Sequence, residues 1–209
     1  MSSDRDEDTS SVDEPLSDRL QTWLRADGPK SIGGLLDHFG PQAFAVAFVL
    51  LMAPSALPIP TGGVTHVFDV VTILLAFQLI VGRTKPWLPA KLRDRELKSL
   101  RSEKTQSRLV RPIAKVEKVA RPRLARTLHS PPGRVVFGVL VIVLTLAAFI
   151  APPFSGLDTL PALGVVVLSL GVLLTDALIA GIGVLIGVGG IGLMIALAGA
   201  ITAAFGKIF

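Results

Sequence analysis

The sequence predicts an all-α polytopic membrane protein with two proline-interrupted helical hairpins, which form an internal repeat and are joined by a basic helical cytoplasmic loop. Three observations support this fold class. Half of the 209 residues are hydrophobic, and the mean hydropathy is +0.61. The charges are segregated, because 41–82 and 135–206 are almost free of charged side chains. Their long apolar runs, about 18 residues or more, are typical of membrane spans.

The chain begins with an acidic, polar stretch that lacks the basic start and apolar core of a cleaved signal peptide. We expect 1–15 to be a disordered tail and 16–209 to form a single membrane domain. Within that domain, 16–40 reads as two short amphipathic helices. They lie either at the membrane interface or on the protein itself, and the sequence leaves both positions open.

A first hairpin is expected over 41–82. Its apolar run meets the stretch APSALPIPTGG at 53–63 before it is long enough to span a bilayer. The prolines break the helix, because each lacks a backbone donor and obstructs a helical hydrogen bond. In hydrocarbon the freed backbone groups need other partners, so such a break offers ligands to something polar. The breaking residues here are Pro54, Pro58 and Pro60.

A basic loop is expected over 83–134, which holds 16 of the 21 Lys and Arg residues against four acids. Membrane segments bound it on both sides, so the excess of positive charge favours a cytoplasmic position near anionic headgroups. The same argument favours a membrane loop over a nucleic-acid-binding segment. We expect the N-terminus to be cytoplasmic as well, with 41–82 entering and leaving on one side of the membrane.

A second hairpin is expected over 135–176, with its breaks at Pro152 and Pro153, followed by a C-terminal membrane segment over 177–206. A shift of 93 residues places the first hairpin over the second, and Pro60 then meets Pro153 while Gly63 meets Gly156. Paired interrupted segments of this kind indicate a transporter-like binding site. The pattern leaves open whether the repeat is inverted or parallel.

Asp69 is the strongest candidate for a ligand or proton site, because an acid inside an apolar run is costly at bilayer depth, by about 2.5–3.5 kcal/mol. His66 lies one helical turn earlier, so the two side chains can meet. Gln78 is on the opposite face, where a bond to a neighbouring helix is the favoured interpretation. Asp158 and Asp176 are further candidates, for which a role as a helix cap or turn residue is favoured over proton transfer.

Arg83 and Lys85 are candidates for binding a phosphate or a lipid headgroup, although a role as a topology anchor is favoured for them. No catalytic motif is present, and the three histidines have no metal-ligand spacing. The absence of cysteine excludes a disulfide or a thiolate metal site. We therefore expect no catalytic residue, no metal and no cofactor, and hence a protein that is not an enzyme.

Four segments of the chain together resemble the ExoD family of bacterial exopolysaccharide-synthesis membrane proteins: LPIP, AFQLIVGRTKPWLP, RPRL and PPFSGLDTLPALGVVVLSLGVLLTDALI. The resemblance covers about 16–200. Its RPR motif adds Arg121 and Arg123 to the phosphate or headgroup candidates. The chain departs from the family pattern at Asp158, where similar proteins carry Asn, and at Thr175–Ala177, where they carry Arg-Asp-Gly.

The resemblance implies a multi-pass protein of the bacterial inner membrane that takes part in exopolysaccharide synthesis. Combined with the two breaks, it favours a transporter- or flippase-like core that binds an ion, a proton or a lipid-linked phosphate. The alternative is an assembly or regulatory partner that docks through its basic loop. The expected partners are the lipid bilayer, an anionic lipid or lipid-linked saccharide, and other exopolysaccharide-synthesis proteins, but no nucleic acid.

Overall fold

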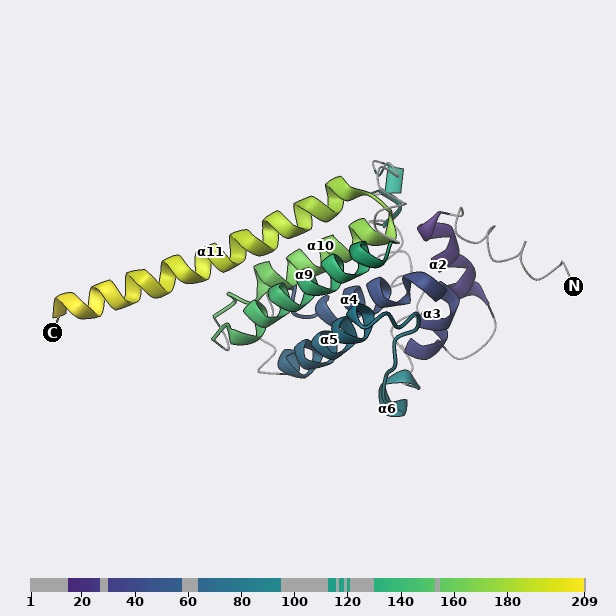
Figure 1. The fold of residues 1–209 in the computed structure, drawn as a ribbon, viewed down its shortest axis with the longest axis horizontal. Helices are drawn as coiled ribbons and strands as arrows, with labels where there is room; N and C mark the ends of the chain where they lie inside the picture. Colours follow the sequence, from purple (N-terminus) through teal and green to yellow (C-terminus); the bar gives the residue numbers. More distant parts are fainter. Residues whose placement is uncertain are drawn as a thin grey trace, which may run out of the picture. The chain divides into compact units, whose positions relative to one another are not determined.

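The computed structural model is helical throughout the residues that it describes, and no strand occurs among them (Figure 1). The described residues are 15–26, 30–57, 64–94, 113–115, 117–118, 120, 130–152 and 155–208. The chain divides into two compact units, of which one comprises Met1–Gly40 with Leu88–Arg121 and the other Pro41–Trp87 with Pro122–Phe209. The predicted hairpins and the predicted C-terminal segment all fall in the second unit.

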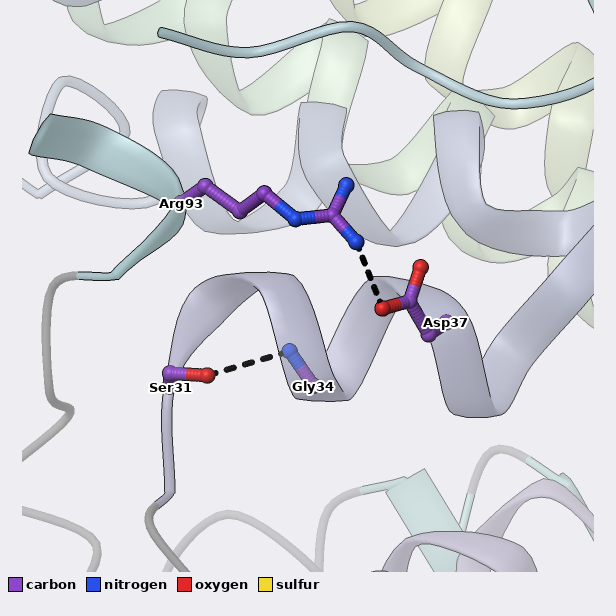
Figure 2. A network of polar contacts seen from close by, with 4 residues as sticks. All are labelled: Ser31, Gly34, Asp37 and Arg93. Carbon is purple, nitrogen blue, oxygen red and sulfur yellow. Dashed lines mark hydrogen bonds and ion pairs between the residues drawn. The ribbon is translucent and has the colours of Figure 1, made fainter. Parts of the chain in front are cut away.

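The first unit contains α2 (Leu16–Arg25), α3 (Ile32–Phe39) and the short α6 (Ala90–Arg93). Helix α3 begins after Ser31, whose Oγ accepts the Gly34 N–H at 3.1 Å. Figure 2 shows this cap, with Arg93 of α6 reaching across to Asp37 at 2.7 Å. Both charged side chains are about half exposed, so their ion pair adds little to stability.

A residue of the basic loop also contacts the first unit. The Glu117 carboxylate accepts the Ser17 hydroxyl at 2.6 Å and the backbone N–H of Leu16 at the start of α2. Helix α2 has no side-chain cap of its own at that end. The carboxylate therefore supplies a partner for helix-terminal donors and a negative charge where a helix favours one.

The second unit is a bundle in which helices of the two predicted hairpins interleave. Its helices are α4 (Ala43–Met52), α5 (Val64–Ile80), α9 (Pro131–Ile150) and α10 (Thr159–Leu173). Helix α5 packs against α4 and α9, while α10 packs against α9 and α4. Each hairpin thus buries its apolar residues against the other one. The pairs 43–52 with 64–80 and 131–150 with 159–173 lie within the hairpins expected over 41–82 and, apart from the first turn of α9, over 135–176.

Two contacts align α5 with α9 in antiparallel orientation. The rings of His66 and Phe149 have centroids 5.2 Å apart. Toward the other end, a Cβ added to Gly138 would lie 2.7 Å from Ile80 Cγ1. Residue numbers therefore fall along α9 as they rise along α5.

A further contact orients α4 against α10. Gln42 Nε2, just before α4, donates to the carbonyl of Leu173, the last residue of α10, at 3.5 Å. Helices α4 and α10 are therefore antiparallel, and both hairpins point the same way. The end of the bundle where α4 and α9 stop and α5 and α10 start is called the broken end below (Figure 1).

The 93-residue shift found in the sequence relates positions that are buried alike. From Asp69 onward, each buried residue of α5 corresponds to a buried residue of α10. The pairs are Asp69 with Ala162, Thr72 with Val165, Leu75 with Leu168, Ala76 with Ser169, and Leu79 with Val172. The same holds for Phe44 with Phe137, Phe48 with Val141, Met52 with Thr145, and Ser55 with Ala148. The shift therefore relates the buried positions of α5 and α10 closely, whereas in the first helices Ala43 and Val46 are buried and their counterparts Val136 and Val139 are exposed.

Helix α11 (Ala177–Ile208) packs along α10 through glycines. A Cβ on Gly164 would lie 2.6 Å from Gly187 Cα, so the two backbones are in direct contact. The helix starts at Asp176, whose Oδ1 accepts the Leu178 N–H at 2.8 Å. Beyond the region that packs on α10, α11 continues past its neighbours in this unit, and most of its residues from 191 to 200 are exposed (Figure 1).

Two of the described helices are long and apolar enough to cross a membrane. They are Pro131–Ile150 and Ala177–Ala200, with mean hydropathies of 2.5 and 2.4. Both have exposed apolar faces, on which Ile150 is 71% and Leu185 is 72% exposed. Apolar faces of this size suit lipid or a protein partner better than water.

We predict that Gly183→Ala destabilises the protein whereas Gly181→Ala does not. A Cβ at Gly183 would lie 2.7 Å from Leu168 Cα and 2.9 Å from the Gly164 carbonyl, both of which are backbone atoms. A Cβ at Gly181 would meet nothing within 4 Å. Both changes raise helix propensity equally, by about 1 kcal/mol, so the pair isolates the α10–α11 contact. Thermal unfolding in detergent would measure it, and equal melting temperatures would contradict the close packing.

Candidate functional site

The candidate site starts from a buried acid. Asp69 is 2% exposed, and its Oδ1 has no hydrogen-bond partner among the described residues. Positions 65, 69, 72, 76 and 79 recur at the three- and four-residue spacing of one helix face, and all are buried. The periodicity that buries the apolar residues of α5 therefore carries Asp69 inside with them. An unpaired buried carboxylate is costly, so this position favours a bound proton or a cation.

Asp158 is brought to the same place from the second hairpin. It precedes the first residue of α10 at the broken end, and it lies close enough to Asp69 for the two carboxyl charges to repel each other. Its side chain makes no capping bond, although the residue occupies the N-cap position. Asp158 therefore lies in the turn before α10 without capping the helix through its side chain, whereas Asp176 caps α11 with its carboxylate. Asp176 lies beyond the other end of α10 and does not join the two acids.

His66 lies at the broken end, and its Nδ1 atom makes no hydrogen bond to the Oδ1 atom of Asp69. Its ring stands against Phe149 of α9. The Nδ1 atom of His66 and the Oδ1 atom of Asp69 are both without a hydrogen-bond partner in the described part of the chain. The histidine is thus held beside α9 by ring packing, one turn from the acid.

Three buried hydroxyls on the helices of the bundle were not singled out from the sequence. Thr72 of α5, Thr145 of α9 and Ser169 of α10 are each 0% exposed, and none of the three hydroxyls has a hydrogen-bond partner within the described ranges. Thr72 lies six residues after His66 and Thr145 four residues before Phe149, so the antiparallel alignment puts them at about the same height.

We refer to Asp69, Thr72 and Thr145 as the buried polar cluster. Leaving a buried hydroxyl unpaired costs about 1–3 kcal/mol, so the cluster suits a polar ligand such as water or a cation. Ser55, next to Pro54 at the first break, is also buried with its hydroxyl unpaired among the residues described. In the sequence, these residues could have been found as hydroxyl side chains at the buried positions of an apolar helix.

The other end of α5 carries the cationic candidates. Gln78 Nε2 donates to the Trp87 carbonyl at 3.1 Å, and the Trp87 N–H donates to Gln78 Oε1 at 2.7 Å. The prediction that Gln78 bonds to a neighbouring helix is wrong, because its partner is the backbone of the loop that follows α5. A groove of about 470 Å³ is lined by Phe77, Gln78, Val81, Arg83 and Trp87. Lys85 is exposed beside this loop and is not among the lining residues.

The two breaks that the structure describes follow the helix ends closely. Helix α4 ends at Met52, two residues before Pro54, and α9 ends at Ile150, two residues before Pro152. Ala151, before Pro152, has the non-helical conformation that a following proline favours (φ −57°, ψ 135°), whereas Ala53, before Pro54, is still helical (φ −56°, ψ −40°). The other break and phosphate candidates lie outside the described residues: Pro58, Pro60, Pro153, Arg121 and Arg123. No cluster of three or more possible metal ligands occurs among the described residues.

Two apolar helices of spanning length, exposed apolar faces and a buried unpaired carboxylate indicate a membrane protein. The family comparison agrees. The chain belongs to the ExoD family, whose model, described as "Exopolysaccharide synthesis, ExoD", matches residues 16–196. The family resemblance expected from the sequence is thereby confirmed, and it points to involvement in exopolysaccharide synthesis.

Two curated proteins are similar to this chain. An uncharacterized protein of Synechocystis sp. is 31% identical over 176 residues, which cover 83% of this chain and 82% of that protein. Protein ExoD of Rhizobium meliloti is 29% identical over 147 residues, which cover 69% of this chain and 60% of that protein. No solved structure matches the chain.

We predict that Thr145→Val raises the thermal stability of the protein. Removing a buried unpaired hydroxyl while keeping the shape of the side chain relieves about 1 kcal/mol, or about 2–4 °C in melting temperature. Thr84→Val, in an exposed loop position, is the matched control and leaves the melting temperature unchanged. A lower melting temperature for Thr145→Val would mean that the hydroxyl is bound in the folded protein.

Proposed function

We propose that this protein is a non-enzymatic, transporter- or flippase-like component of exopolysaccharide synthesis in the bacterial inner membrane, and that its core binds a proton or a cation at the broken end. The observation that carries the proposal is the buried Oδ1 of Asp69, which is unpaired among the described residues, with the carboxyl group of Asp158 from the other hairpin near enough to repel its charge. Family membership supplies the link to exopolysaccharide.

The arrangement of the hairpins supports a parallel internal repeat as the frame of this core. From Asp69 onward, the buried residues of α5 correspond under the 93-residue shift to buried residues of α10, and both hairpins point in the same direction. In such a repeat the two breaks approach each other, so the polar groups that they free can serve one ligand. The single membrane domain expected over 16–209 belongs to the same proposal.

Electrostatics distinguishes between the ligands that the sequence left open, which are an ion, a proton and a lipid-linked phosphate. Two carboxyl groups at one end of the bundle repel a phosphate, so the broken end suits a proton or a cation rather than a lipid-linked phosphate. The polar cluster continues from Asp69 to Thr72 one turn further along α5 and to Thr145 on α9. Its hydroxyls are suitable partners for water or for a dehydrated cation.

The charge pattern and the bundle together support a cytoplasmic position for the N-terminus and for 83–134. Helix α5 ends and α9 begins at the end of the bundle opposite the broken end, so the chain between them leaves and returns on one side. That chain is the basic one.

A flux experiment tests the proposed core. In vesicles containing the full chain, we expect proton or cation flux above that of empty vesicles, and Asp69→Asn to reduce it to the empty-vesicle level, because the amide carries no exchangeable negative charge. Asp158→Asn lowers the flux, because it removes the second carboxyl group of the pair, and Asp37→Asn, which alters an exposed acid of α3, is the control.

Three outcomes would argue against this function. The first is the absence of flux in the wild-type chain, and the second is full cellular exopolysaccharide production by Asp69→Asn. The third is loss of production only when charges in 83–134 are reversed, which would favour an assembly or regulatory partner that docks through the loop.

A reporter fusion tests the orientation. An enzyme that is active only in the periplasm, fused after Arg101, is expected to be inactive, whereas a cytoplasmic fluorescent reporter at the same position is bright. The reverse pattern would place the basic loop outside the cell and overturn the proposed topology.

A further inference from the structure

We propose that the groove formed by Phe77, Gln78, Val81, Arg83 and Trp87 binds an anionic phospholipid, with its phosphate on Arg83 and an acyl chain along α5. The site lies at the opposite end of α5 from Asp69, and the last residue of the helix, Ile80, is about 17 Å from Asp69 along the axis at 1.5 Å per residue. It is therefore independent of the proton or cation site, and either can exist without the other.

The end of α5 places Arg83 at the rim of the groove. Gly82 has a φ of +91°, a left-handed conformation that glycine adopts without strain. The Gly82 N–H donates to the Leu79 carbonyl and the Arg83 N–H to the Gln78 carbonyl, both at 3.0 Å. This pair of bonds is the Schellman motif, which closes a helix and turns the chain away from its axis. The C-terminal end of a helix carries a partial negative charge and by itself disfavours an anion. The guanidinium of Arg83 supplies the positive charge that an anion needs at this end.

The wall opposite α5 is held in place by the side chain of Gln78. Its amide uses both its donor and its acceptor on the backbone of Trp87. These two bonds fasten the loop against α5 and leave the indole 62% exposed. The groove is therefore formed before any ligand arrives, which lowers the entropic cost of binding.

The walls are apolar and open outward. Phe77 is 55% and Val81 is 80% exposed, although both are large hydrophobic residues. They end a stripe along α5 at helical spacing, whose other exposed members are Val67, Val70 and Leu74. Such a stripe suits an acyl chain, and a tryptophan at its end suits the boundary between hydrocarbon and water.

The charge at the end of the stripe selects the headgroup. Arg83 offers a planar fork of donors that matches a phosphate, and the exposed Lys85 lies two residues further on. The combination of an apolar stripe, an interfacial indole and a cation matches an amphipathic ligand with a negative phosphate. An anionic phospholipid has this chemistry and surrounds the protein in its membrane, so it is the occupant that we propose.

Fluorescence quenching tests the site in the full chain. The protein has two tryptophans, so Trp23→Phe leaves Trp87 as the only indole. In vesicles with equal fractions of brominated lipid, we expect brominated phosphatidylglycerol to occupy the site over brominated phosphatidylcholine by about fivefold. Arg83→Gln removes this preference and Arg83→Lys restores part of it. Gln78→Leu lowers it, because the loop is released.

Controls make the result decisive. Each variant is compared at equal helicity and equal elution in size exclusion, and Arg134→Gln, a basic residue of α9 outside the groove, keeps the full preference. An equal loss in Arg134→Gln would overturn the proposal in favour of general attraction to the surface. Equal quenching by both lipids in the Trp23→Phe protein would also overturn it. Displacement of phosphatidylglycerol by polyisoprenyl phosphate at a much lower mole fraction would replace the proposed occupant with an isoprenoid carrier.

Discussion

The architecture of the bundle depends on packing between hairpins. Helix α5 packs on α9 and α10 packs on α4, so each hairpin buries its apolar face against the other. The rings of Phe48 in α4 and Phe137 in α9 have centroids 5.6 Å apart, so the first helices of the two hairpins also touch. Because the two hairpins point in the same direction, Pro54 and Pro152 lie at the same end of the bundle, and with them Asp69 and Asp158. The acid pair is thus a result of packing and not of any local motif.

The two hairpins have similar helix arrangements but differ in the polarity of their buried side chains. The positions that correspond to Asp69, Thr72 and Thr145 are Ala162, Val165 and Met52, all buried and all apolar. The buried polar cluster joins α5 of the first hairpin to α9 of the second, whereas the corresponding positions on α10 and α4 are apolar. Helix α5 carries an acid near the broken end and is followed by the cation Arg83 where it closes at Gly82. The two proposed sites, one for a proton or cation and one for a phosphate, therefore lie at opposite ends of one helix.

The sequence predicted the positions of the helices better than the contacts between them. Long apolar runs and prolines located both hairpins, because proline ends a helix through its own covalent geometry. Asp69 stood out because a charge interrupts an apolar run. Thr72, Thr145 and Ser169 did not, since a hydroxyl hardly changes hydropathy and its burial depends on neighbours distant in the chain. The partner of Gln78 was missed because it follows from the turn at Gly82. The sense of the repeat required contacts between helices, which a periodic pattern does not contain.

The length of α11 has a consequence for the membrane around it. Its 32 residues extend for about 48 Å, whereas the hydrocarbon layer of a bilayer is about 30 Å thick. Glycine contacts hold its first half against α10, so this helix cannot adjust its tilt freely. The excess must be met by the lipid, through local thickening, or by emergence of the C-terminal turns into the headgroup region. We therefore expect the stability of the protein to depend on the acyl-chain length of its host membrane.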